Sequence, residues 1–305
     1  MRATEFILHH YDTSPFSEKA RLLFGLHGLA WRSVIQPTIM PKPDLTPLTG
    51  GYRRAPVMQI GADIYCDSQI IMAEINRRAG ARAADDELGW AVNLWSDRLF
   101  FQASVAAIFG ELGETVPRAF VEDREKLMGR PFDIAAMKAA ATPMRAQWRG
   151  QAAWLETSLA TGSPFLRGDT PGIVDIAAYM NIWFLVSFAP HLAEPLMGDF
   201  EHLRAWRERV KAIGHGSRSE MAPAAALDMA RRSEPDETAA HDPADPLSLS
   251  PGAAVTVAAD DYGRDPVLGR LVAANRERVT IAREDPKLGR LHVHFPRVGY
   301  LVMPL

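Results

Sequence analysis

The sequence of 305 residues contains very little cysteine and no strong excess of charge. Its single cysteine, Cys66, cannot form an intrachain disulfide, a Cys-x-x-Cys redox pair or a zinc site built from several cysteines. The net charge is −3 at pH 7 and the isoelectric point is about 6.3. A chain of this charge is not expected to bind nucleic acid or an anionic membrane surface through a general electrostatic attraction.

Long apolar runs are also missing. No run approaches the roughly 18 residues that a membrane-spanning helix needs. The first residues, MRATEF, reach charged and polar side chains too early for a secretory signal peptide. We therefore expect a cytoplasmic protein that does not enter a membrane. Because 47% of the residues are hydrophobic, and because domains usually contain about 100 to 200 residues, we expect two or three domains.

The first 82 residues alternate between strand-like and helix-like patterns. Residues 6–9 are rich in strand-forming side chains, and Pro15 begins a helix with apolar residues at helical spacing. A second strand is expected at 31–36, and a hairpin at 57–65. Asp67 is a suitable N-cap for a third helix. The resulting order, βαβ-loop-ββα, predicts a thioredoxin-like domain over residues 1–82.

The pattern then becomes helical and later polar. Residues 86–232 are typical of an all-helical domain, with apolar side chains recurring at helical spacing. Residues 174–186 are apolar on nearly every side, which predicts a central helix. Residues 233–250 are polar, acidic and interrupted by prolines, as in a linker.

The C-terminal residues 251–305 return to a strand pattern. Five short strand candidates are separated by turn residues, and the sequence DPxLGRL occurs at 265–271 and again at 285–291. Two equivalent turns in so short a segment predict a small β-barrel-like domain, in which closure hides the edge strands. The fold class expected is thus α/β plus all-α, with a third, β-rich region.

Three motifs in the first domain resemble the glutathione transferase superfamily in their order and spacing. They are YDTSPFS at 11–17, RRAPVM at 53–58 and DSQII at 67–71. The resemblance covers residues 5–80 and extends more weakly to GDTPGIVD at 168–175, similar to the helix-capping segment of the family. It implies glutathione as co-substrate, a small hydrophobic electrophile, a role in detoxification and a homodimer.

By this resemblance, the catalytic group is a hydroxyl that stabilises the glutathione thiolate. Lowering a thiol pKa from roughly 8.5 by about two units requires roughly 2.7 kcal/mol of preferential stabilisation of the anion. A hydroxyl hydrogen bond and the positive end of a helix supply such energy. Ser14 occupies the position where omega-class relatives carry a nucleophilic cysteine. Tyr11, Thr13 and Ser17 are alternatives, and Ser14 could also be simply an N-cap.

The resemblance also assigns the glutathione-binding residues. Pro56 is expected to be cis, so that the backbone of Ala55 pairs with the peptide part of glutathione. Asp67 and Ser68 are expected to hold the γ-glutamyl end at a helix N-terminus, although the family usually has Glu or Gln at the Asp67 position. Arg54 stands where relatives often place a basic residue near the glycine carboxylate. A proline that begins an edge strand and a solvated arginine are the alternative interpretations of Pro56 and Arg54.

We expect no metal site, because the histidine pairs His9–His10 and His292/His294 have no third ligand at a suitable spacing. The electrophile is expected between the first two domains, where Phe16, Phe100 and Phe101 are candidate contacts. The leading hypothesis is a glutathione transferase. The alternative is a non-catalytic binding or scaffold protein that keeps the fold and engages a macromolecular partner through its C-terminal domain.

Overall fold

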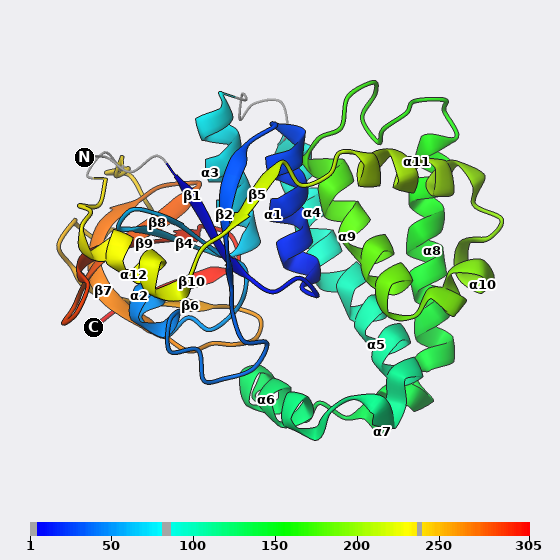
Figure 1. Cartoon of the computed structure of the whole chain (residues 1–305), viewed down its shortest axis with the longest axis horizontal. Coiled ribbons are helices and arrows are strands. Elements are labelled where there is room, and N and C mark those ends of the chain that lie inside the picture. The colour runs from blue at the N-terminus through cyan, green and yellow to red at the C-terminus, as the bar shows by residue number, and fades with distance from the viewer. Residues whose placement is uncertain (1–4, 81–86, 237–239) are drawn as a thin grey trace.

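The computed structural model of the protein describes residues 5–80, 87–236 and 240–305. The strands gather at one end of the molecule, and the helices α4 to α11 form the other end (Figure 1). The predicted boundary between the first two domains, near residues 82–86, lies outside the described residues.

The N-terminal domain has the thioredoxin-like order that the sequence predicts. Strand β1 pairs with β2 in parallel and with β3 antiparallel, and β3 forms a hairpin with β4. The loop between the second and third strands contains one additional short helix, α2. The elements of this domain are β1 (Phe6–His10), α1 (Pro15–Leu26), β2 (Ala30–Ile35), α2 (Thr46–Thr49), β3 (Val57–Ile60), β4 (Asp63–Cys66) and α3 (Ser68–Ala79).

The second domain is helical, as predicted. Its elements are α4 (Glu87–Trp95), the π-helix η2 (Ser96–Phe100), α5 (Phe101–Leu112), the 3-10 helix η3 (Gly113–Thr115), α6 (Arg118–Met128), α7 (Ile134–Ala139), α8 (Ala141–Leu159), α9 (Ile173–Phe188), the 3-10 helix η4 (Pro190–Leu192), α10 (Ala193–Met197) and α11 (Glu201–Ala212). Helix α9 is the predicted central helix, because most of its side chains are buried. No single described helix is long and apolar enough to cross a membrane. Helix α9 and residues 190–197 reach that length and hydropathy only when taken together, and the two segments are bent by 114° relative to each other.

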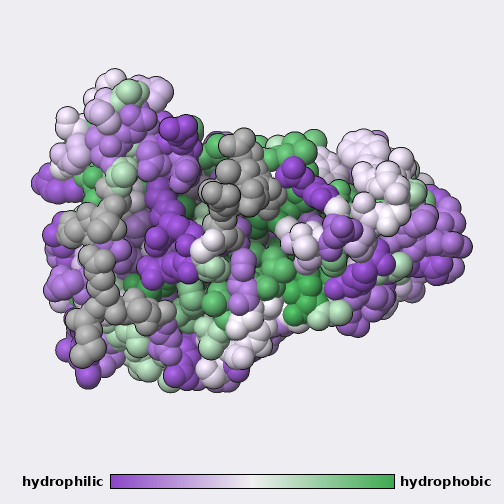
Figure 2. Space-filling view, turned by 90° about the horizontal axis from the view of Figure 1, so that it is seen from above, coloured by the Kyte–Doolittle hydropathy of each residue, from purple (hydrophilic) through white to green (hydrophobic). Residues whose placement is uncertain are grey.

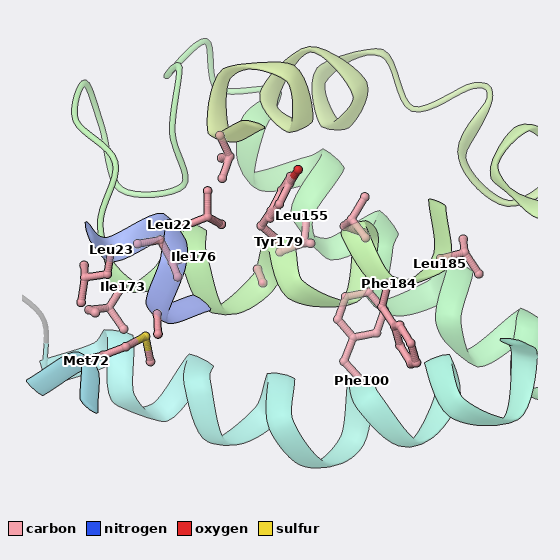
Figure 3. Close-up of a cluster of buried hydrophobic side chains, with 14 of the residues drawn as sticks. Leu22, Leu23, Met72, Phe100, Leu155, Ile173, Ile176, Tyr179, Phe184 and Leu185 are labelled. Carbon is pink, nitrogen blue, oxygen red and sulfur yellow. The ribbon is translucent and has the colours of Figure 1, made fainter. Parts of the chain in front are cut away.

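One hydrophobic core joins the first two domains. Leu22 and Leu23 of α1 and Met72 of α3 lie beside Ile173 and Ile176 at the start of α9 (Figure 3). Their burial removes apolar surface from water, which favours a fixed contact between the domains. Seen from above, apolar side chains gather over the middle of the molecule, between two mainly hydrophilic ends (Figure 2).

The C-terminal region is β-rich, which confirms that part of the predicted fold. Strands β6 (Ala254–Ala259), β7 (Val267–Ala274), β8 (Arg278–Asp285), β9 (Gly289–Pro296) and β10 (Tyr300–Pro304) are antiparallel to their neighbours in this region. Before them, β5 (Ser217–Glu220) pairs with β2, and α12 (Pro223–Arg231) packs near the same strand. The sequence patterns did not predict β5.

The C-terminal strands also extend the N-terminal sheet. Strand β9 pairs with β4 in parallel, with Ile64 opposite Val293, and the described strands form one ten-stranded sheet in the order β10-β6-β7-β8-β9-β4-β3-β1-β2-β5. Side chains of both regions share a second core, in which Leu45 and Leu48 lie with Phe295. The first domain and the C-terminal region are therefore one structural unit around β4 and β9.

Polar contacts strengthen this junction. The His294 imidazole lies 2.8 Å from the Asp63 carboxylate and stacks on Tyr65 with ring centroids 4.4 Å apart. The fully buried carboxylate of Glu74 pairs with Arg77, Arg78 and, across the junction, Arg278. These three guanidinium groups lower the pKa of Glu74 to about 2 despite its burial. In the described ranges, no group of three or more histidine, cysteine or acidic residues is arranged to hold a metal ion.

Candidate functional site

The turn between β1 and α1 places several hydroxyl groups at a helix N-terminus. Ser14 is the N-cap of α1: its Oγ accepts a hydrogen bond from the backbone N–H of Ser17 at 3.1 Å, and Pro15 follows at the first helical position. Ser14 is only 1% exposed. The Tyr11 side chain lies beside this turn, and burial raises the pKa of its phenol against the opposing influence of Arg124 and Ser14. The phenol is therefore neutral near pH 7.

The N-terminal end of β3 supplies the second part of the site. The Ala55–Pro56 peptide bond is cis, as expected from the sequence. Arg54 and Ala55 face a cavity of about 690 Å³ that Tyr11 and Thr13 also line. The structure therefore brings together Arg54, Ala55 and the β1–α1 turn. Ser14 and Pro56 lie directly next to lining residues in the sequence but do not themselves line the cavity.

This cavity lies between the N-terminal domain and the helical domain, and one end of it is apolar. The rings of Phe101 and Phe184 are stacked with centroids 5.8 Å apart, and Phe109 meets Phe132 edge-on at 5.1 Å. Phe16 of α1 contacts Phe101 edge-on at 4.7 Å. All five rings line the cavity, whereas Phe100 is fully buried against Trp148. Of the three predicted phenylalanines, Phe16 and Phe101 face the cavity.

The other end is polar and carries a cluster of basic side chains. Lys42 donates from Nζ to the carbonyl oxygen of Arg53 at 2.9 Å, and Arg53 and Arg124 both pair with the carboxylate of Asp123. Burial and the nearby Arg124 and Arg53 lower the pKa of Lys42 to about 8. Three basic side chains around one carboxylate favour the binding of an anion. Of this cluster, only Arg53 lies within a motif from the sequence.

An acidic side chain of the helical domain also lines the polar end. Asp97 lies on the π-helix η2 and accepts hydrogen bonds from the fully buried Lys19 Nζ at 2.6 and 2.8 Å. Lys19 also donates to Asn93 Oδ1 at 2.9 Å. Burial raises the pKa of Asp97 to about 6, although Lys19 acts in the opposite direction. Irregular π-helical turns are frequent at functional sites, but the sequence patterns did not indicate this one.

The residues expected to hold the γ-glutamyl end lie behind the cavity wall. Asp67, with φ of 99°, is the N-cap of α3; its carboxylate accepts from the backbone N–H of Gln69 at 2.8 Å and from the Tyr300 hydroxyl at 3.0 Å. Ser68 is only 3% exposed. Neither side chain lines the cavity in this structure. Arg54 instead pairs with Asp261, a residue of the C-terminal region that lines the cavity with it.

Comparisons with known proteins identify the family to which the chain belongs. A family model described as the glutathione S-transferase N-terminal domain matches residues 8–83, and one described as the glutathione S-transferase C-terminal domain matches residues 102–209. A solved GST-like protein from Pseudomonas syringae is 35% identical over 99% of this chain and 100% of its own, with a TM-score of 0.82. The chain therefore belongs to the glutathione S-transferase superfamily.

More distant solved structures share the fold alone. The tau-class glutathione S-transferase MiGSTU from mango, Mangifera indica, is 16% identical over 69% of this chain and 90% of its own, with a TM-score of 0.52. FzlA from C. crescentus is 20% identical over 81% of this chain and 100% of its own, with a TM-score of 0.50. No curated protein matches the sequence significantly. Residues 210–305 lie beyond both family models, whereas the Pseudomonas syringae protein matches the chain along nearly its whole length.

Proposed function

We propose that the protein is a glutathione transferase that binds glutathione at the polar end of the cavity and a small hydrophobic electrophile at the apolar end. The observation that carries this proposal is that one cavity joins the N-terminus of α1, a cluster of basic side chains and a group of aromatic rings. The Lys42 cluster is suited to a carboxylate of glutathione, and the rings to an apolar co-substrate. A cytoplasmic location and a homodimer belong to the same proposal.

The thiolate is best stabilised at the β1–α1 turn. The Ser14 hydroxyl oxygen accepts a hydrogen bond from the backbone N–H of Ser17, and the Ser14 hydroxyl is also hydrogen-bonded to the Tyr11 side chain, which lines the cavity. The residues on either side of it, Thr13 and Pro15, line the cavity. A sulfur atom at this wall would therefore lie near the positive end of α1 and near a hydroxyl donor. In the reaction, the thiol loses its proton, the thiolate attacks the electrophile, and a leaving group departs or a double bond accepts the electron pair.

Substitution of Ser14 tests this role. Ser14→Ala is expected to reduce turnover by about tenfold or more and to raise the pKa of bound glutathione, because one charge-assisted hydrogen bond to the thiolate is lost. The affinity for glutathione is expected to change little, since the carboxylate-binding residues remain. Steady-state kinetics with an electrophile, together with the thiolate absorbance of the complex across pH, measure both effects.

Two further substitutions serve as matched controls. Tyr11→Phe and Thr13→Val each remove one cavity-lining hydroxyl and keep the approximate volume of the side chain. If Tyr11→Phe abolishes turnover while Ser14→Ala retains normal kinetics and a normal thiol pKa, the phenol is the donor and the role of Ser14 is refuted. Melting curves of all three variants separate these effects from a loss of the helix cap, which costs about 1 kcal/mol.

The second candidate function is a non-catalytic binding protein. One observation favours it: β10 lies at the edge of the sheet and carries exposed apolar side chains at Leu301 and Met303, followed by Leu305. Exposed apolar edges are suited to contact with another chain. This function predicts that the protein has a macromolecular partner and no turnover with any electrophile, even at saturating glutathione.

A further inference from the structure

The loop between β6 and β7, residues 260–266, brings the C-terminal region to the cavity. Asp260 pairs with Arg98 of η2, and the backbone N–H of Gly263 donates to the carbonyl oxygen of Leu127 in α6 at 2.7 Å. Gly263 has φ of +58°, and a Cβ there would lie 2.8 Å from Leu127 Cδ1 and 3.0 Å from Arg54 Nε. The loop is therefore fitted closely against both other domains.

Two residues of this loop form part of the cavity wall. The Asp261 carboxylate pairs with Arg54 at 2.5 Å through Oδ1, and the Arg54 guanidinium lies 4.1 Å from the centroid of the Tyr262 ring. Asp261 and Tyr262 line the cavity, as Arg54 does. Burial raises the pKa of the Tyr262 phenol to about 12, so the phenol stays neutral beside these charges.

This ion pair retains unused hydrogen-bonding capacity. Asp261 Oδ1 accepts from Arg54 and from the backbone N–H of Tyr262, whereas Oδ2 has no partner among the described residues. Arg54 Nε is buried and likewise has no partner within the described ranges. A buried donor without a partner is costly, so this nitrogen can gain from a further hydrogen-bond acceptor. The pair thus places a cation and an anion side by side, and each of them can form a further hydrogen bond.

The other carboxylates near the cavity are already engaged. Asp67 is held by Gln69 and Tyr300 and does not line it, and Asp97 is held by Lys19. Asp123, which lines the polar end, is shared by two arginines and the backbone N–H of Met40.

The remaining lining carboxylate, Asp133, is engaged as the N-cap of α7, where it accepts from the backbone N–H of Ala136 at 2.9 Å. Asp261 is therefore the carboxylate best placed to receive a cationic group of a ligand.

We propose that the Arg54–Asp261 pair recognises the zwitterionic α-amino acid group of the γ-glutamyl end of glutathione, with the ammonium group on Asp261, the carboxylate on Arg54 and the Tyr262 ring as the adjoining wall. The C-terminal region thereby completes the binding site. This inference rests on the proposed function. It assigns Arg54 to the γ-glutamyl end rather than to the glycine carboxylate, and it transfers to Asp261 the role that the sequence gave to Asp67.

The test compares two ligands by calorimetry on the full-length protein. One ligand is glutathione and the other is glutaryl-cysteinyl-glycine, which has hydrogen in place of the ammonium group. The wild-type protein is expected to bind glutathione at least about tenfold more tightly than the analogue, because a charge-assisted hydrogen bond is lost with the ammonium group. Asp261→Asn is expected to bind the two ligands about equally.

Asp260→Asn is the matched control, because Asp260 lies in the same loop and pairs with Arg98 but does not line the cavity. It should keep the wild-type preference, as should Asp67→Asn. Melting curves confirm that each variant is folded. If the wild-type protein binds no glutathione, the proposed function fails and this inference fails with it. If the wild-type protein binds glutathione with the expected preference, two results overturn the inference alone. One is that Asp261→Asn keeps that preference, and the other is that Asp261→Asn binds glutathione more tightly than the wild type does.

Discussion

Removal of residues 241–305 is expected to leave a chain that aggregates instead of folding. The deletion takes away β9, the neighbour of β4, and exposes the backbone edge of β4. It also uncovers Leu45, Leu48, Val57 and Ile64, whose side chains are fully buried against the C-terminal strands. Net stabilities of domains are only about 5 to 15 kcal/mol, so the loss of a shared core exceeds what the remaining chain can tolerate.

Size-exclusion chromatography and circular dichroism of the truncated chain measure this effect. The matched control keeps every residue but introduces a protease site within residues 246–250, which are neither helix nor strand. After cleavage, the two pieces are expected to remain associated and to melt together. A truncated chain that is monomeric, melts cooperatively and binds glutathione would contradict the shared core and would show that the C-terminal region is an accessory domain.

Mild acid is expected to destabilise the protein through two buried histidines of β1. His9 is 1% exposed and His10 is fully buried. Burial lowers the pKa of His9 to about 4; burial, with the charge of Arg21, lowers that of His10 to about 3. In the unfolded chain, histidine has a pKa of about 6.5. The unfolded state therefore binds more protons than the folded state below pH 6.5, and stability falls as pH decreases from there toward 4.

The hydrogen bonds of these rings explain why they stay neutral. His9 Nδ1 accepts from Gln36 Nε2 at 3.2 Å, so its Nε2 donates to Gln59 Oε1 at 2.9 Å. His10 Nδ1 accepts from Arg21 at 3.2 Å, so its Nε2 donates to Ser33 Oγ at 3.1 Å. A proton on either Nδ1 would face the N–H group of Gln36 or Arg21 that now donates to it, which disfavours the charged form of each ring. The two rings thus stabilise the sheet through hydrogen bonds from β1 to Gln59 of β3 and to Ser33 of β2.

Denaturant unfolding at pH 7 and pH 4.5 measures the effect. Each histidine is expected to contribute on the order of 2 kcal/mol to the loss of stability between these values. His9→Gln and His10→Gln should be less stable than the wild type at pH 7 but should lose less stability on acidification. His202→Gln, at an exposed position, is the control and should behave like the wild type. A wild-type protein equally stable at both pH values would contradict the neutral, buried state of the two rings.

Local patterns predicted the elements whose stability depends on nearby residues. Ser14 and Asp67 are the N-caps of α1 and α3, and the apolar segment at 174–186 is the buried helix α9. The GDTPGIVD segment caps α9, as its similarity to a helix-capping segment implied: Asp175 accepts from the backbone N–H of Gly172 at 3.1 Å and from Trp206 Nε1 at 2.7 Å. Cap and periodicity signals are local, so a single sequence contains them.

Non-local pairing could not be predicted in the same way. Strand β5 has the sequence SRSE and each of its four residues is exposed, so no apolar alternation marks it, and only its pairing with β2 makes it a strand. The pairing of β4 with β9 joins residues more than 200 positions apart. The same limit applies to the site: Lys42, Arg124 and Asp261 belong to separate loops and helices, and only the fold brings them to one cavity.

The central claim is that the cavity binds glutathione and stabilises its thiolate. Calorimetric titration of the full-length protein with reduced glutathione, with the thiolate absorbance of the complex followed across pH, tests it most directly. The account predicts binding and a thiol pKa about two units below the ordinary value of roughly 8.5. Binding with an unchanged thiol pKa would contradict the catalytic proposal, and the absence of binding would favour the non-catalytic binding protein.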